Sequence, residues 1–500
     1  MGVLTNLKTK IRSFANSNKE YPIIAALGAG LYPFLHNYIS NFTLVNSWSQ
    51  LWFFLVFFIG LPMLVFLLAN LATRRIEFLK KYHPYVLPIL NLTTLVFLII
   101  ISIYGPKKKL IALGLLVAVF LAIILRKHFK KIIIFQLILA VIGFFNLIPK
   151  FMLPLNYSNQ WMTSKDDIIS VKFKKTPNVY IIQPDGYTNF SELKKENYDI
   201  DNSKFEAYLE SNDFKLYNDF RSNYFSTLSS NSSMFAMNHH YYNNVKGHTH
   251  EFYNARKIII GDNPVVSIFK ENDYKTFLIL ENSYLLVNRS EIKYDYCNIN
   301  YNEVPFLARG FGINKDTQAD LEQAIINNKK TNNFYFIEQI SPGHISTFKR
   351  NSKGKEEERN IYIDKLKEAN QWLTSVIKTI DENDKDAIVV IVADHGGFVG
   401  YDYSLESTIK QDDPTLINSA FSAALAIKWP DNNPPEYDSK LKTNVNLFRI
   451  LFSYLGENKD ALNYLEKDDS YIIIKEGAPN GIYKAIDEKG NITFDKIVND

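Results

Sequence analysis

Long apolar runs separated by short basic stretches dominate the first 150 residues. The runs cover residues 21–44, 51–71, 85–104, 110–125 and 132–148. Most of them approach the ~20 residues that an α-helix needs to cross a bilayer, and the fourth is near the short limit. A helix of a soluble protein is rarely apolar on every face, and this pattern occurs five times. The pattern predicts a membrane domain over residues 1–152 with about five transmembrane helices.

The basic residues between the runs predict an orientation. Those of the amino terminus, of residues 74–81 and of residues 126–131 would share one side, which the positive-inside rule makes cytoplasmic. The cluster Lys107–Lys109 falls on the other side and contradicts this assignment. With five spans the chain after about Met152 lies outside the cytoplasm. An even number of spans would reverse this, and the run 21–44 is interrupted by Pro33, His36 and Asn37.

After a polar linker over residues 153–176, the pattern changes to short apolar runs that alternate with helical spacings. The runs at 178–182, 275–280, 333–340, 387–393 and 419–428 predict strands, and residues 203–212, 357–382 and 445–455 have the spacing of helices. Residues 481–494 predict a hairpin with Lys489 and Gly490 at its turn. This alternation predicts an α/β domain over 177–500, with a mainly parallel sheet flanked by helices.

Two of the predicted strands end in the same way, with an acid and a glycine. Asp394, His395 and two glycines follow the run 387–393, and Asp185 and Gly186 follow the run that starts at 178. Ligands of open α/β sheets bind at the carboxyl ends of the strands. If the two strands are neighbours, two carboxylates and an imidazole converge, a set that suits Zn²⁺ or Mn²⁺. The alternative for Asp185 is turn chemistry, because Pro-Asp-Gly is itself a strong turn signal.

The segment 222–235 is crowded with hydroxyl groups and precedes a possible helix. A hydroxyl at a helix start lies near positive backbone dipoles, which suit a phosphate or sulfate group. A metal held near such a hydroxyl lowers its pKa and makes it a nucleophile. The alternative is a polar loop that contains an N-cap.

Composition narrows the function classes. The single cysteine, Cys297, excludes a disulfide framework and a multi-cysteine metal site. A formal charge of +4 over 500 residues does not indicate nucleic acid as a partner.

The order of these motifs resembles the alkaline phosphatase/sulfatase superfamily, in its membrane-anchored bacterial branch of sulfatase-like hydrolases and transferases. That branch includes lipoteichoic acid synthases and phosphoethanolamine transferases. The matching pieces are Pro177-Asn-Val-Tyr-Ile-Ile-Gln-Pro-Asp-Gly-Tyr187, Ser222-Asn-Tyr-Phe-Ser-Thr227 and Asp394-His395-Gly396, with weaker matches at 342–344, 362–366 and 444–449.

The resemblance implies roles for individual residues. Asp185, Asp394 and His395 would be metal ligands, and Thr227 would be both the nucleophile and the fourth ligand. His344 would lie near the leaving group or a substrate oxygen, with a surface loop as the alternative. One divalent ion is expected: Zn²⁺ or Mn²⁺, with Mg²⁺ or Ca²⁺ as further options. Three residues behind the nucleophile would bind substrate or be structural: Ser230, His239 and His240.

The sequence also departs from the sulfatases proper, which activate a cysteine or serine within a Cys/Ser-x-Pro-x-Arg signature. Thr227 is followed by Leu228, Ser229 and Ser230, and Cys297 stands in another context. The resemblance therefore implies a phosphotransferase or hydrolase of the bacterial inner membrane. Its catalytic domain would be extracytoplasmic and would act on phosphate or sulfate esters of envelope lipids or glycans. The alternatives are a non-catalytic scaffold of envelope-polymer assembly that retains the fold, and a sulfatase without an oxidised cysteine.

Overall fold

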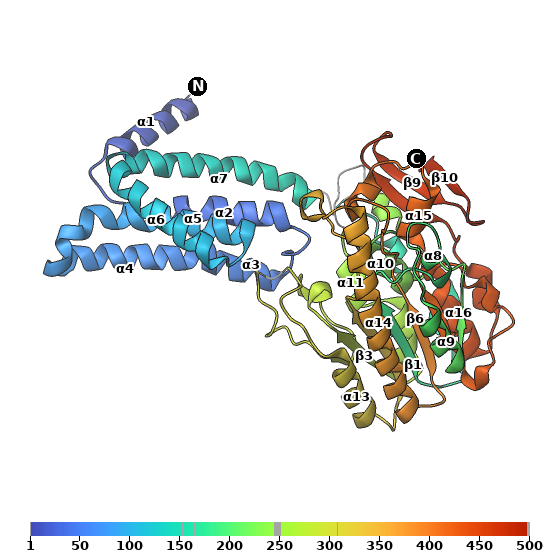
Figure 1. Ribbon diagram of the computed structural model, residues 1–500. Helices are drawn as coiled ribbons and strands as arrows, with labels where there is room; N and C mark the ends of the chain where they lie inside the picture. Colours follow the sequence, from blue (N-terminus) through green and yellow to red (C-terminus); the bar gives the residue numbers. More distant parts are fainter. Residues whose placement is uncertain are drawn as a thin grey trace. The chain divides into compact units, whose positions relative to one another are not determined.

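The computed structural model describes residues 2–152, 155, 157–164, 166–244, 252–307 and 309–497. The chain forms two units (Figure 1). The first is helical and takes in residues 1–156 with the short segments 287–289 and 305–309, and the second is an α/β unit made of the remaining residues. The predicted linker begins at residue 153, which lies outside the described residues. From residue 157 onward this segment belongs to the second unit, where the apolar side chains of Trp161 and Ile168 are buried.

Helix α1 precedes the first predicted apolar run, and the other helices of the first unit coincide with the predicted runs. A short π-helical stretch, Val56–Gly60, joins α3 to α4, so that the run 51–71 forms one helical stretch. The helices are α1 (Gly2–Asn16), α2 (Pro22–Asn41), α3 (Trp48–Leu55), α4 (Leu61–Arg75), α5 (His83–Tyr104), α6 (Lys108–Leu125) and α7 (Phe129–Met152).

Three helical stretches among the described residues are long and apolar enough to cross a membrane. They are Trp48–Arg75, Glu77–Tyr104 and Lys108–Met152, and an 18-residue window within each has a mean hydropathy of 2.7, 2.5 and 2.5, respectively. The last stretch has 45 residues and consists of α6 and α7, with a 3-10 turn over Arg126–His128 between them. Helix α2 is not among the three, so the count of five spans stays a prediction.

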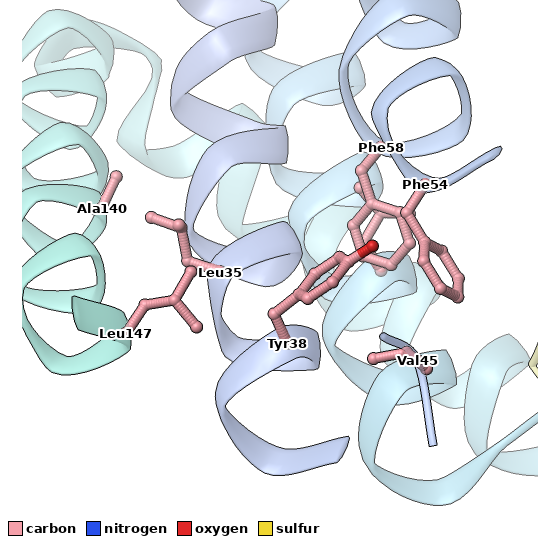
Figure 2. Close-up of a cluster of buried hydrophobic side chains, with 8 residues drawn as sticks. Leu35, Tyr38, Val45, Phe54, Phe58, Ala140 and Leu147 are labelled. Atoms are coloured by element: carbon pink, nitrogen blue, oxygen red, sulfur yellow. The ribbon is translucent and has the colours of Figure 1, made fainter. Parts of the chain in front are cut away.

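Helix α2 packs among α4, α5 and α7. A Cβ atom on Gly30 would lie 2.0 Å from the Phe58 carbonyl oxygen, and one on Gly28 would lie 2.7 Å from Gln136 Oε1. Small residues permit this close approach of helix backbones. Further along α2, Leu35 and Tyr38 belong to an apolar cluster with residues of the neighbouring helices (Figure 2).

A buried pair of amides links three helices of this unit. Asn91 Nδ2 donates to Gln136 Oε1 (2.9 Å) and to the Ala25 carbonyl oxygen (2.7 Å), and Gln136 Nε2 donates back to Asn91 Oδ1 (2.8 Å). Within an apolar bundle such bonds hold helices together, because an unpaired amide there is costly. Asn91 and Gln136 therefore fix α5 and α7 against α2.

The second unit is built on a seven-stranded sheet with the order β2-β7-β6-β1-β5-β3-β4. Strand β1 pairs in parallel with both β5 and β6, and β7 is antiparallel to its two neighbours. The four central parallel strands β6, β1, β5 and β3 lie at the four predicted runs from 178 to 393. The strands are β1 (Val179–Pro184), β2 (Phe214–Leu216), β3 (Tyr274–Leu280), β4 (Tyr296–Cys297), β5 (Asn332–Gln339), β6 (Ile388–Val392) and β7 (Leu425–Lys428).

Helices pack on this sheet and give the predicted α/β architecture. Phe336 of β5 contacts Phe235 of α10, and Phe334 of β5 stacks on Phe269 of α12. The long helix α14 leads directly into β6. The helices are α8 (Phe190–Leu193), α9 (Ser203–Ser211), α10 (Thr227–Ala236), α11 (Ala255–Ile260), α12 (Pro264–Glu271), α13 (Thr317–Asn327), α14 (Lys355–Asn383), α15 (Pro414–Phe421) and α16 (Leu447–Gly456).

The strand predicted over 419–428 is wrong in its first half. Residues 414–421 form α15, because Pro414 is favoured in the first helical turn and the Asp413 side chain accepts a hydrogen bond from Thr415 N. The strand itself, β7, covers Leu425–Lys428. The predicted hairpin is present as β9 (Gly481–Ile486) and β10 (Ile492–Lys496), and β8 (Ser470–Ile474) adds a third antiparallel strand to it.

Candidate active site

The sheet brings the two acidic strand ends together. Strands β1 and β6 are parallel neighbours, with Ile182 in register with Ile391, so that their carboxyl ends lie at the same edge. One ligand atom each from Asp185, Asp394 and His395 lies within 4.8 Å of the others. The Gly186 amide donates to Asp394 Oδ1 at 3.0 Å, which fixes one strand end against the other.

Thr227 is the first residue of α10 and lies against this cluster. Its hydroxyl donates to Asp185 Oδ2 at 3.1 Å, and its Oγ1 is 3.4 Å from His395 Nε2. The side chains of Ser226 and Ser229 pair with each other at 2.6 Å instead. The start of a helix carries a partial positive charge, which favours an anion at this position.

Hydrogen bonding sets the tautomer of His395. Its Nδ1 lies 2.8 Å from the Gly396 carbonyl oxygen, which can only accept, so Nδ1 carries a hydrogen. The other nitrogen, Nε2, faces Asp394 Oδ2 at 3.3 Å and Asp185 Oδ1 at 4.0 Å. This is the arrangement in which a histidine binds a metal, with the second nitrogen held by an acceptor.

The charges of the cluster are strongly coupled. Burial, and then the nearby Asp394 carboxylate, raise the pKa of Asp185 to about 7. Burial alone would lower the pKa of His395, but the carboxylates of Asp394 and Asp185 outweigh it and the pKa is raised. Two carboxyl groups held this close favour a shared positive charge, from a proton or from a cation.

The donor set fits a divalent cation. Asp394 Oδ2 is buried and receives no hydrogen bond within the described part of the chain. Carboxylate oxygens, an imidazole nitrogen and a hydroxyl are the ligands that borderline and hard divalent ions take. The atoms that could hold such an ion come from Asp185, Asp394, His395 and Thr227.

A cavity of about 540 Å³ opens onto Thr227 and His395. His344 also lines it, with its ring centroid 5.8 Å from that of His395. Burial and the neighbouring His395 lower the pKa of His344 to about 4, so its ring is neutral at physiological pH. The remaining walls are mostly apolar and include Phe225, Tyr242, Phe252, Tyr284, Phe348, Phe398 and Ile473.

Three predicted substrate-binding residues do not line this cavity. Ser230 is fully buried in α10, and His239 bonds to the Tyr224 hydroxyl (3.1 Å) and to the Lys467 carbonyl oxygen (2.8 Å). His240 bonds to the Ser229 carbonyl oxygen at 2.8 Å. Their assignment to substrate therefore remains a prediction without support from the cavity walls.

Two features of the site escaped the sequence analysis. Lys475 follows β8 and lines the cavity, although it lies almost 250 residues from Thr227 in the chain. Glu338 of β5 is in register with Gln183 of β1 and is 1% exposed. Strand β5 is buried on both of its faces. An acid inside the predicted apolar run 333–340 was therefore the signal that could have singled out Glu338.

Glu338 is a buried acid whose two carboxyl oxygens have no hydrogen-bond partner in the described structure. Burial, and then the negative charges of Asp185 and Asp394, raise its pKa well above the ordinary value. The folded chain therefore keeps a proton that the unfolded chain loses above about pH 4.5. The stability that Glu338 contributes is present below that pH and is lost as pH rises toward the raised pKa.

Replacing this acid by a neutral side chain is expected to stabilise the protein at alkaline pH. Glu338→Gln should match the wild type near pH 4.5 and exceed its unfolding free energy at pH 8 by about 2 kcal/mol. Thermal unfolding of the metal-free full chain in detergent, compared at the two pH values, measures this. Parallel pH dependence of the two proteins would contradict the assignment of the raised pKa to Glu338.

The family model described as Sulfatase matches residues 185–457. A search of curated proteins returned no match.

Several solved structures are similar at low identity. The integral membrane lipooligosaccharide phosphoethanolamine transferase A (EptA) of Neisseria meningitidis is 13% identical, with 87% of this chain and 95% of that chain covered and a TM-score of 0.42. The zinc complex of the periplasmic domain of EptC from Escherichia coli is 12% identical, with 65% and 95% covered and a TM-score of 0.42. The lipoteichoic acid synthase LtaP of Listeria monocytogenes is 16% identical, with 65% and 91% covered and a TM-score of 0.41.

The family match covers more than half of the chain and contains all of the residues that meet at the edge of the sheet. The chain therefore belongs to the sulfatase family, within the alkaline phosphatase/sulfatase superfamily.

Proposed function

We propose that this protein is a membrane-bound, metal-dependent enzyme that transfers or hydrolyses phosphate esters through Thr227. The observation that carries the proposal is the position of Thr227 Oγ1, 3.1 Å from Asp185 Oδ2 and 3.4 Å from His395 Nε2 at the start of α10. A hydroxyl is a poor nucleophile unless its proton is removed or its pKa is lowered. Asp185 and His395 could accept that proton or hold a cation that lowers the pKa of the hydroxyl.

The proposed reaction has two steps. The Thr227 hydroxyl gives up its proton toward Asp185 Oδ2, with which it is hydrogen-bonded, and Oγ1 attacks phosphorus. The bond from phosphorus to the leaving oxygen breaks, the leaving oxygen departs with the electron pair and takes up a proton, and a phospho-threonine forms. An acceptor hydroxyl, or water, then attacks the same phosphorus and releases Thr227. When bound, a divalent ion would lower the pKa of the Thr227 hydroxyl and neutralise charge on the transferred group.

His344 would lie near the oxygen that attacks phosphorus or leaves it, and would exchange a proton with that oxygen. Its Nδ1 lies 2.5 Å from the Ile345 carbonyl oxygen, so Nδ1 carries the hydrogen and Nε2 is an acceptor. Since its pKa is lowered to about 4, the ring is unprotonated at neutral pH and can accept a proton from an acceptor hydroxyl.

Phosphate is favoured over sulfate by the nucleophile itself. The sulfatases proper use an oxidised cysteine or serine, and threonine stands at that position here. Cys297 lies on β4, at the edge of the sheet. A sulfatase that needs no oxidised residue is the alternative chemistry, and a non-catalytic scaffold of envelope-polymer assembly is the alternative from another class.

We further propose a cell-envelope substrate. The membrane-capable helices of the first unit support a protein anchored in the bacterial inner membrane. The basic residues between the predicted apolar runs support a catalytic unit on the extracytoplasmic side. A lipid-borne donor or acceptor, or an envelope glycan, would be available to such an enzyme.

Turnover of chromogenic esters by the purified full chain in detergent tests this function. We expect the chain to cleave bis(4-nitrophenyl) phosphate, to lose activity on chelation and to regain it with Mn²⁺ or Zn²⁺. Cleavage of 4-nitrophenyl sulfate should be far slower, and Cys297→Ser should leave all rates unchanged. Metal binding without turnover of any ester would favour the scaffold, and sulfate as the better substrate would favour the sulfatase.

A further inference from the structure

His240 contacts the helix that carries the nucleophile. Its Nε2 lies 2.8 Å from the carbonyl oxygen of Ser229, two residues after Thr227 in the first turn of α10. The Tyr242 amide donates to the other ring nitrogen, Nδ1, at 2.8 Å. A nitrogen that accepts an N–H bond carries no hydrogen, so Nε2 carries it and donates to Ser229. Burial lowers the pKa of His240 to about 3, so this neutral form persists at physiological pH.

The ring of His240 is clamped between two aromatic rings. It stacks on Tyr224 with a centroid distance of 3.9 Å and an interplanar angle of 20°, and on Phe252 at 3.9 Å and 24°. Trp161 makes a T-shaped contact with it, with the ring centroids 5.5 Å apart. The Tyr224 hydroxyl in turn accepts the backbone amide of His240 at 3.2 Å. The ring therefore cannot turn or slide without breaking several contacts at once.

A strained turn places the backbone amide of Tyr242 against His240 Nδ1. Tyr241, Tyr242 and Asn243 have φ angles of 44°, 52° and 60°, in the left-handed region that favours glycine. Each such residue costs roughly 1–2 kcal/mol, so three in succession persist only where the surroundings impose them. This turn folds the Tyr242 amide back onto Nδ1 and so holds the tautomer that donates to Ser229. Strain of this kind points to a functional constraint on the segment.

We infer that His240 is a positioning residue for Thr227: it fixes the first turn of α10 and so holds the nucleophile against Asp185 and His395. The readout in activity rests on the proposed function, whereas the structural readout does not. The neighbouring His239 provides a matched control. It is equally buried and lies beside the same Tyr224, but its hydrogen bonds go to Tyr224 and Lys467 and not to α10.

The test compares His240→Phe, which keeps a stacking ring and removes the donor, with His239→Phe in the full chain. Amide hydrogen exchange of the metal-free protein, followed by mass spectrometry, is read in peptides covering residues 222–236. We expect His240→Phe to raise exchange there at least tenfold, and His239→Phe to leave it within about twofold of the wild type. His240→Gln, which keeps an N–H donor near the position of Nε2, should restore part of the protection.

Kinetics with bis(4-nitrophenyl) phosphate give the second readout. We expect His240→Phe to lower kcat by about tenfold to a hundredfold with KM little changed, since a 1 Å displacement of a reacting group costs about a hundredfold. Equal effects of the two phenylalanine variants on exchange would show general core packing and overturn the inference. If His240→Phe selectively raises exchange but the wild type turns over no ester, the proposed function is contradicted and the inference about His240 stands. If His240→Phe does not fold, His240→Asn against His239→Asn makes the same comparison.

Discussion

Thr227→Ala is expected to lower kcat for phosphodiester cleavage by about 10⁴-fold or more while the protein stays folded. Removal of a catalytic nucleophile has effects of this size in hydrolases, where the remaining rate comes from binding and electrostatics alone. The threonine side chain is small and 8% exposed, and its hydroxyl donates a hydrogen bond to the Asp185 carboxylate. Its loss should therefore leave the hydrophobic core unchanged. Thr227→Ser keeps the hydroxyl and should retain measurable activity.

Neighbouring serines provide the controls for this prediction. Ser226 and Ser229 carry hydroxyls in the same turn, but they pair with each other at 2.6 Å and neither contacts Asp185 in the hydrogen bonds described. Ser226→Ala and Ser229→Ala should keep most activity. Mass spectrometry of quenched reactions should find phosphate on the peptide that contains Thr227. A phosphate trapped on either serine, or an active Thr227→Ala protein, would show that the nucleophile lies elsewhere.

The convergence of Asp185 and Asp394 could be predicted from the sequence because it depends on a general property of parallel sheets. Each acid follows an unbroken apolar run, and the carboxyl ends of neighbouring parallel strands share one edge. Adjacency of the two strands was the missing condition, and the sheet order supplies it. The apolar runs of the first unit could also be predicted from the sequence, because every helix that spans a bilayer must be long and hydrophobic.

The walls of the cavity could not be predicted in the same way. Phe252, Phe348, Phe398 and Lys475 come from four segments that are far apart in the sequence and share no spacing. Composition also did not single out one hydroxyl among the many in residues 222–235. The resemblance named Thr227, and the structure adds that its hydroxyl is the one that reaches Asp185.

The position of His240 shows a further limit of prediction from the sequence. Its contact with Ser229 depends on three consecutive residues with positive φ, and none of the three is a glycine. Sequence patterns predict left-handed conformations at glycine and, less often, at asparagine. Two tyrosines in such a turn give no local signal, because tertiary contacts alone impose the conformation.

Asp394→Asn is expected to weaken binding of Mn²⁺ or Zn²⁺ by about a hundredfold or more and to abolish turnover. The asparagine retains an oxygen for the Gly186 amide, which bonds to Asp394 Oδ1 at 3.0 Å, so the strand ends should stay together. It removes the negative charge and the proposed ligand oxygen, Asp394 Oδ2, which lies 3.3 Å from His395 Nε2. Isothermal titration of the full chain in detergent measures the affinity, and Asp412→Asn, at a carboxylate that is 96% exposed, is the matched control.

The same titration should depend strongly on pH. Burial and the Asp394 carboxylate raise the pKa of Asp185 to about 7, and the two carboxylates raise that of His395 against the effect of burial. A cation must displace these protons, so wild-type affinity should rise about tenfold per pH unit for each proton released as pH increases from 6 to 7. In Asp394→Asn the charge that raises both pKa values is gone, and the pH dependence should become shallower. Wild-type affinity that does not change between pH 6 and 8 would mean that the metal binds away from Asp185 and His395.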